Sequence, residues 1–189
     1  IIFILILFTS IILLYSLIKD IIVIIYTKKN YSQINRLISH LGFGLLILSI
    51  ALNTNLSVEK NINLKVGEYF QTNEYRVYFE SLTGEKNSNY NSIIGKFSLS
   101  NKDKKIGYLR PEIRIYQQPF MATSEASIKS GFWGDFYITI TNIQESDYFN
   151  VRFQYKPFMN FIWFSVLLIA IGGLLSIIKK KKFDYEKKR

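Results

Sequence analysis

Three long stretches without a charged side chain constrain the fold of this chain more than any other feature. They span residues 1–18, 37–53 and 157–178, and only His40 within them can carry a charge. Each is about long enough to cross a hydrocarbon layer of ~30 Å, the shortest with help from its polar flanks. A helix in a soluble core rarely stays apolar on every face over such a length. We therefore expect a membrane protein with three transmembrane α-helices.

We place the boundaries of the predicted segments where apolar stretches change to charged ones. We expect a first transmembrane helix with an amphipathic extension at 1–26, a basic loop at 27–36, a second transmembrane helix at 37–53, an extramembrane domain at 54–156, a third transmembrane helix at 157–178 and a basic tail at 179–189. The first stretch lacks the basic start and the small-residue exit of a signal peptide, so we interpret it as a span.

The net charge of +10 is distributed unevenly over these segments. The first loop carries +3, the tail +5 and the much longer domain only +2. Because basic residues favour the side of a membrane that is not translocated, the loop and the tail are predicted to share that side. The domain is predicted on the opposite side. A nearly neutral domain also argues against nucleic-acid binding.

Apolar and polar residues alternate through most of the domain, which is typical of β-strands. In the segment 74–80, Tyr75, Val77 and Phe79 fall on one face of a strand. Similar strands are expected at 92–100, 105–110, 112–117, 135–140 and 148–156. Thr123 or Ser124 could cap one or two helical turns that end before Gly131. We predict an all-β sandwich or partly open barrel of six to eight strands between the second and third helices.

The residue types in the domain exclude several kinds of active site. The chain has no cysteine and one histidine, so residues 54–156 cannot form a Ser-His-Asp triad, a Cys-His pair or an ordinary zinc site. Glu112 and Arg114 alternate with isoleucines, as on a solvated strand face. Gly172 and Gly173 are predicted to permit close packing of the third helix.

His40 is the remaining candidate. Ionisable residues inside a membrane are costly and often functional. A histidine near a helix end can also lie at the membrane interface. The sequence alone leaves both interpretations open. Arg36, His40 and Gly44 lie one turn apart on one helical face, where the glycine could make room for a flat macrocycle and the arginine could reach a propionate. A neutral imidazole is a common ligand of haem iron. Met159 is expected at the domain end of the third span, most of a bilayer thickness from His40, and Met121 lies in the domain, so the second axial ligand would come from another polypeptide.

Most of the chain resembles the C-terminal part of CcmF, the haem-lyase component of a multi-subunit cytochrome c maturation system. The runs that carry the resemblance are ISHLGFGLLILSIALNTNLSVEKN, IGYLRPEIRIYQQPFMATSEASI, DFYITI and VRFQYKPFMNFIWFSVLLIAIGGLL. In that family, a histidine at the position of His40 is an axial ligand of a b-type haem. This haem is thought to keep incoming haem reduced while it is attached to apocytochrome c.

The resemblance also implies what this chain lacks. The tryptophan-rich haem-handling segment, the external histidines and the second membrane ligand of the family belong to an N-terminal part that is not in this sequence. We therefore expect either a split chain or a fragment of a longer protein, and in both cases not a complete enzyme. Its expected partners are that N-terminal part, a haem chaperone, apocytochrome c and the lipid bilayer.

The expected location is the mitochondrial inner membrane with the β domain in the intermembrane space, or a bacterial plasma membrane with the domain in the periplasm. Nearly half of the residues are Ile, Asn, Lys, Tyr or Phe, whose codons are rich in A and T, as in many mitochondrial genomes. The alternative function is a non-catalytic structural subunit of a larger respiratory assembly in the inner membrane, with the fold retained and the haem absent.

Overall fold

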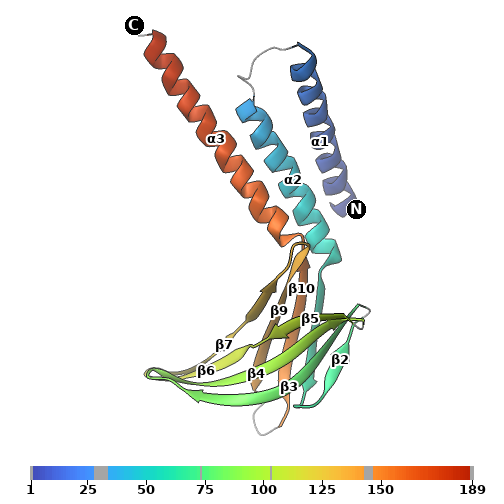
Figure 1. The fold of residues 1–189 in the computed structure, drawn as a ribbon, viewed down its shortest axis with the longest axis vertical. Coiled ribbons are helices and arrows are strands. Elements are labelled where there is room, and N and C mark those ends of the chain that lie inside the picture. The colour runs from blue at the N-terminus through green and yellow to red at the C-terminus, as the bar shows by residue number, and fades with distance from the viewer. Residues whose placement is uncertain (1, 28–33, 73, 103, 143–146, 188–189) are drawn as a thin grey trace. The chain divides into compact units, whose positions relative to one another are not determined.

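The chain separates into two compact units in a computed structural model that describes residues 2–27, 34–72, 74–102, 104–142 and 147–187. One unit comprises Ile1–Leu56 with Pro157–Arg189, and the other comprises Ser57–Lys156. The first unit is helical and the second is built of strands (Figure 1). The predicted fold class is confirmed, because an all-β domain lies in sequence between the second and third of three long apolar helices.

The helical unit contains α1 (Ile2–Thr27), α2 (Ile34–Leu56) and α3 (Met159–Lys187). Each includes a segment long and apolar enough to cross a membrane. α2 packs against both α1 and α3 and lies between them (Figure 1). Many large apolar side chains of all three helices are exposed, which is the surface that lipid would cover.

The helices extend beyond the predicted spans into their polar flanks. α2 begins at Ile34, inside the predicted basic loop, and α3 continues through the lysine run of the tail. Lysine and arginine are good helix formers, and their long stems can leave the hydrocarbon for the interface. α2 therefore extends beyond its predicted span at both ends, and α3 extends beyond its span only at the C-terminal end.

The β unit has two antiparallel sheets. The first has the order β1-β10-β9-β8, with β1 (Val58–Leu64), β10 (Phe149–Pro157), β9 (Gly134–Asn142) and β8 (Ser127–Ser130). The second has the order β2-β3-β4-β6-β7, with β2 (Tyr69–Gln71), β3 (Tyr75–Lys86), β4 (Tyr90–Asn101), β6 (Glu112–Gln117) and β7 (Phe120–Glu125). A further strand, β5 (Lys104–Leu109), pairs with the second half of β4, while β6 pairs with the first half.

Alternation along the strands builds the core between the sheets. Tyr75, Val77 and Phe79 are buried on one face of β3, as the sequence predicted. The rings of Phe79 and Phe97 stack with their centroids 4.3 Å apart. The opposite sheet contributes a second set of buried side chains, namely Ile138, Ile140, Val151 and Phe153.

Two expectations about the strands were wrong. The described residues form ten strands rather than six to eight, because β1, β2, β7 and β8 were not predicted as strands. β1 is polar because it lies at the edge of its sheet and pairs only with β10. The helical turns expected within 122–131 are the strands β7 and β8. β7 returns along β6 after the turn that contains Pro119, and this pairing decides its structure rather than the capping potential of Thr123 or Ser124.

Candidate functional site

α2 and α3 lie close together where each carries a glycine. A methyl group on Gly42 would come within 2.8 Å of the Ser165 carbonyl oxygen on α3. A methyl group on Gly172 would come within 2.1 Å of Ser39 Oγ on α2. Close approach of the two backbones at small residues is a common way for membrane helices to associate. The predicted packing role is confirmed for Gly172, whereas no atom lies within 4 Å of the corresponding position on Gly173.

The opposite side of α2 packs against α1. A methyl group on Gly44 would lie 3.3 Å from Leu14 Cδ2, so the space beside this glycine is filled by the neighbouring helix. The predicted contact between Gly44 and a haem ring stays a prediction. What the geometry shows directly is that Gly44 lets α1 approach α2.

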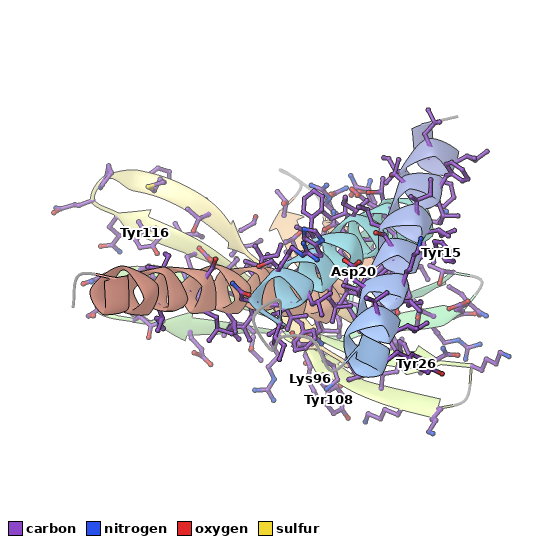
Figure 2. All side chains as sticks on the ribbon, turned by 90° about the horizontal axis from the view of Figure 1, so that it is seen from above. Tyr15, Asp20, Tyr26, Lys96, Tyr108 and Tyr116 are labelled. Carbon is purple, nitrogen blue, oxygen red and sulfur yellow. The ribbon has the colours of Figure 1, made fainter. Side chains whose placement is uncertain are left out.

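Arg36 and Asp20 form an ion pair between the same two helices, with 3.6 Å between Arg36 Nη2 and Asp20 Oδ2. Asp20 extends from α1 toward α2 (Figure 2). This pair was not predicted from the sequence. The signal was a carboxylate within an otherwise apolar helix, since such a group usually has a partner of opposite charge.

His40 is exposed on α2. At about 100° per residue, His40, Phe43 and Ile50 lie on a strip between the Gly44 side, which faces α1, and the Gly42 side, which faces α3. All three side chains on this strip are exposed. No hydrogen bond or ion pair joins the imidazole to any residue that the structure describes. The imidazole is therefore accessible to a ligand from outside the described part of the chain.

No second axial ligand for His40 is found among the residues of the helical unit that the structure describes. Met159 begins α3, next to Pro157, whose carbonyl oxygen accepts a hydrogen bond from Asn53 Nδ2 at 2.5 Å. Asn53 lies 13 residues beyond His40 on α2, which corresponds to about 20 Å along the helix axis. Met121 belongs to β7 in the other unit.

The described residues thus provide a metal ligand for one side of a haem and none for the other side. His40 supplies one nitrogen, and no cluster of three or more His, Cys, Asp or Glu residues able to hold a metal ion occurs among the described residues. Haem is the metal cofactor that a single histidine can hold from one side, because the porphyrin supplies four of the ligands itself.

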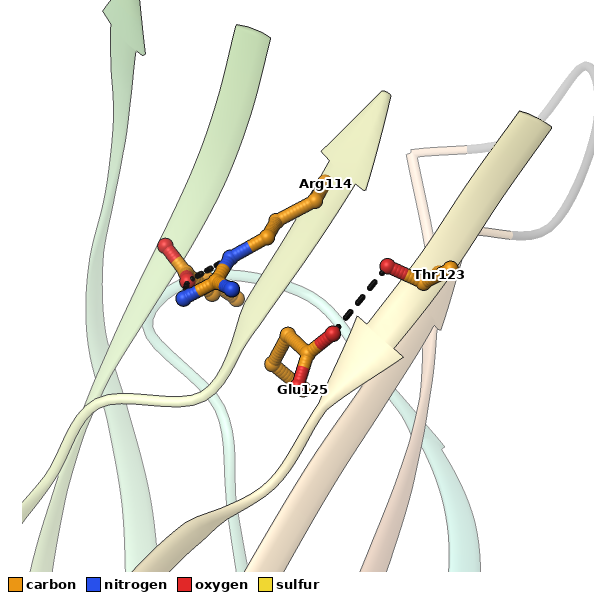
Figure 3. A network of polar contacts seen from close by, with 4 residues as sticks. Arg114, Thr123 and Glu125 are labelled. Atoms are coloured by element: carbon orange, nitrogen blue, oxygen red, sulfur yellow. Dashed lines mark hydrogen bonds and ion pairs between the residues drawn. The ribbon is translucent and has the colours of Figure 1, made fainter. Parts of the chain in front are cut away.

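Glu112 and Arg114 form an ion pair on β6, next to a hydrogen bond from Thr123 to Glu125 on β7 (Figure 3). The guanidinium of Arg114 also lies 5.0 Å from the centre of the Tyr90 ring. The charged side chains on this face of β6 are therefore paired with groups of the same sheet. Charge pairs of this kind on a strand surface stabilise the sheet.

Comparisons with known proteins place this architecture. Residues 55–157 match the family model of the CcmF C-terminal beta-sandwich. The chain is 31% identical to the cytochrome c-type biogenesis protein CcmF of Haemophilus influenzae over 154 residues, which are 82% of this chain and 24% of that protein. It is 30% identical to CcmF of Escherichia coli over 151 residues, which are 80% of this chain and 23% of that one.

A solved structure of a cytochrome c haem lyase CcmF superposes with a TM-score of 0.63 at 15% identity, over 75% of this chain and 24% of that one. At this identity, the superposition supports the fold alone. The chain spans about a quarter of the length of the curated relatives that it matches.

The fold and the comparisons together define a class of membrane proteins in which a β-sandwich is inserted between apolar helices. Within that class, the chain belongs to the CcmF family of cytochrome c biogenesis proteins and corresponds to its C-terminal part.

Proposed function

We propose that this chain is a membrane subunit of a cytochrome c haem lyase and that His40 is one axial ligand of a b-type haem. The observation that carries the proposal is the exposed imidazole of His40 on the strip of α2 between its two helix contacts, with no partner among the described residues. An imidazole inside an apolar segment is costly unless a partner binds it. The family membership of the chain makes haem the partner of choice.

Haem in such a site supplies one-electron redox chemistry at its iron. The residues of this chain hold and orient it. His40 would supply one nitrogen ligand to the iron, and Arg36 would provide a cation one turn nearer the N-terminus of α2. Gly42 and Gly172 fix α2 against α3, which sets the direction of the imidazole.

The remaining parts of the lyase lie outside this sequence. The second axial ligand and the tryptophan-rich segment belong to the N-terminal part of the same protein, and the β domain is the surface on which partners dock. The partners are a haem chaperone and apocytochrome c. The β domain lies on the side of the membrane opposite the basic loop and tail, in an intermembrane space or a periplasm.

The test uses this chain purified together with its N-terminal partner in detergent. We expect a reduced b-type absorption spectrum that His40→Ala abolishes, since the iron then loses a ligand. Leu41→Ala is the matched control, because Leu41 is the next residue on α2 and faces a different direction. An unchanged spectrum in the His40→Ala variant would overturn the proposal.

A second measurement separates the lyase from an accessory subunit. Native complexes from solubilised membranes should contain this chain together with cytochrome c maturation proteins and haem. Migration with a respiratory complex that lacks both would instead support the structural role.

A further inference from the structure

The β domain contains an open cleft of about 950 Å³ that is separate from the His40 site. The turn between β4 and β5 lines one part of it, and the turn between β8 and β9 lines another. Sequence reasoning missed this cleft, although the run Gly131-Phe132-Trp133-Gly134 was a signal, since adjacent large aromatic residues between glycines mark an aromatic turn.

The cleft lies where the two sheets part. Where the end of β5 meets the start of β8, the sheets are joined, because the backbone N–H of Arg110 donates a hydrogen bond to Ser127 Oγ at 2.8 Å. The side chain of Lys129 crosses Gly107, where a methyl group would come within 2.8 Å of Lys129 Cε. Residues 104–106 and residues 131–134 line the cleft instead. The opening is therefore a feature of the fold and not a gap left by one side chain.

Aromatic rings form the floor and one wall of the cleft. Tyr75, Phe136 and Tyr155 contact one another, with ring centroids 4.8 to 5.2 Å apart. Phe132 and Trp133 are 69% and 63% exposed, and they meet edge to face with centroids 5.1 Å apart. Exposed tryptophan and phenylalanine beside a buried aromatic floor are typical of the centre of a binding surface.

Three lysines line the remaining part, namely Lys102, Lys104 and Lys105, and the described lining contains no carboxylate. Asp103 lies between them in sequence and outside the described residues. Lys102 and Lys105 also line a shallow basic groove on the neighbouring surface, with Arg76. The carboxylate in that groove, Glu80, is already paired with Lys96 at 2.7 Å. Positive charge thus continues from the cleft over the β4–β5 turn.

The lining is a poor match for a metal centre. It contains no histidine, cysteine or methionine among its described residues. Burial, followed by the neighbouring Tyr155, raises the pKa of Tyr75, so its hydroxyl stays protonated at neutral pH. The cleft instead combines an apolar interior with a cationic edge, which complements an apolar side chain flanked by carboxylates.

We propose that this cleft binds a polypeptide segment of a partner protein in which an aromatic side chain is flanked by acidic residues. The aromatic side chain enters between Trp133 and the Tyr75–Phe136–Tyr155 floor. The acidic residues meet Lys104 and Lys105. This deepens the docking role proposed for the β domain and is independent of haem at His40.

The experiment uses the full chain in nanodiscs of neutral phosphatidylcholine and carries Trp163→Phe, so that Trp133 is the one remaining tryptophan. The probe is the peptide acetyl-Glu-Phe-Glu-Glu-Phe-Glu-amide. We expect a saturable change in the emission of Trp133 that weakens at high salt. The peptide with lysine in place of each glutamate, and the one with alanine in place of each phenylalanine, should bind about tenfold more weakly or worse.

Variants locate the binding. The double variant Lys104→Glu with Lys105→Glu should weaken the probe about tenfold or more, whereas Lys86→Glu makes the same kind of charge change at the far end of β3 and should not. Lys104→Gln with Lys105→Gln should have an intermediate effect. Thermal unfolding of each variant separates lost binding from lost folding.

Other results would overturn the proposal. They are the absence of a saturable response to the probe, equal binding of the lysine peptide, or equal binding by the Lys104 and Lys105 variants. A response of Trp133 to anionic phosphatidylglycerol without peptide would assign the surface to lipid instead. None of these results affects the absorption spectrum that tests His40, so failure here is distinguishable from failure of the haem proposal.

Discussion

Gly172 of α3 lies so close to Ser39 of α2 that a methyl group on the glycine would meet Ser39 Oγ at 2.1 Å and the Asn35 carbonyl oxygen at 2.7 Å. The neighbour of Ser39 is His40, the proposed haem ligand. The contact between Gly172 and Ser39 therefore holds α2 against α3 at the residue next to the imidazole.

Gly172→Ala should separate α2 from α3. Two of the clashing atoms are backbone, so relief requires the helices to move, and overpacking of this kind costs about 1–3 kcal/mol. We expect a lower thermal stability of the chain in detergent, measured by size-exclusion chromatography after heating. Gly173→Ala is the control, since nothing lies within 4 Å of the added methyl group and alanine favours helix. Equal stability of the two variants would contradict the close packing.

The positions of the helices could be predicted because hydropathy reports them directly. The contacts between the helices could not, because Gly42, Gly44 and Gly172 look alike in the sequence and only the fold assigns one to α1 and two to the α2–α3 contact. The same holds for Asp20, whose partner Arg36 is on another helix. A sequence shows which groups need a partner, but the choice of partner depends on packing.

In the β domain, alternation predicted the core strands and failed at the margins. Val77 and Phe79 are fully buried, and their period of two is clear. β1 has one solvated face and, among the described residues, an unpaired edge. Its sequence is therefore largely polar and was not predicted as a strand. The strand β7 was mistaken for helical turns because Ser and Thr suit both a helix cap and a strand. The aromatic cleft depends on residues from five strands and two turns, which no local pattern brings together.

Truncation of the core should unfold the β domain at a lower temperature. Phe97 is fully buried and stacks on Phe79, so Phe97→Ala should cost about 3–5 kcal/mol of unfolding free energy. Phe97→Leu keeps more of the volume and should cost less. Phe120→Ala is the matched control, because that ring is 84% exposed and its loss should change stability by about 0.5 kcal/mol or less. Chemical denaturation followed by far-ultraviolet circular dichroism gives the comparison, and equal costs at Phe97 and Phe120 would contradict the assigned core.

The membrane topology can be tested on a clean background because the chain has no cysteine. A single cysteine at Glu85, near the end of β3, should react with a membrane-impermeant maleimide added to the outside of spheroplasts or mitoplasts. A cysteine at Lys29, in the basic loop, should react only after the membrane is permeabilised, since basic loops stay on the untranslocated side. The reverse pattern would show that the charge distribution does not set the orientation.

The pair of Glu80 and Lys96 should make the stability of the β domain depend on pH. The hydrogen bond from Lys96 is the main cause that lowers the pKa of Glu80 below its ordinary value of 4.5. A lowered carboxyl pKa contributes stability above the pKa of the unfolded chain, and this contribution is lost as the pH falls through the pKa of the folded state. Glu80→Gln should therefore lower the melting temperature slightly at neutral pH and have no effect in acid. Glu85→Gln, on the same strand, is the control, and a pH-independent difference for Glu80→Gln would exclude the ionic origin.

The role of Arg36 can be decided by separating its two possible anions. In the structure it pairs with Asp20, and the haem proposal adds a propionate. Asp20→Asn and Arg36→Gln should each destabilise the chain in detergent, and the double variant should cost less than the sum, with a coupling of about 0.5–3 kcal/mol. Lys19→Gln removes the adjacent charge and should show no coupling with Arg36→Gln.

Haem retention then distinguishes the two anions. If Arg36 contacts a propionate, Arg36→Gln accelerates haem loss to apomyoglobin, whereas Asp20→Asn removes a competing carboxylate and leaves haem bound as firmly or more firmly. We expect this asymmetry, because the pair at 3.6 Å is long for a charge-assisted hydrogen bond and both side chains are partly exposed. Haem loss at the same rate from the Arg36→Gln and Lys19→Gln variants would restrict Arg36 to holding α1 against α2.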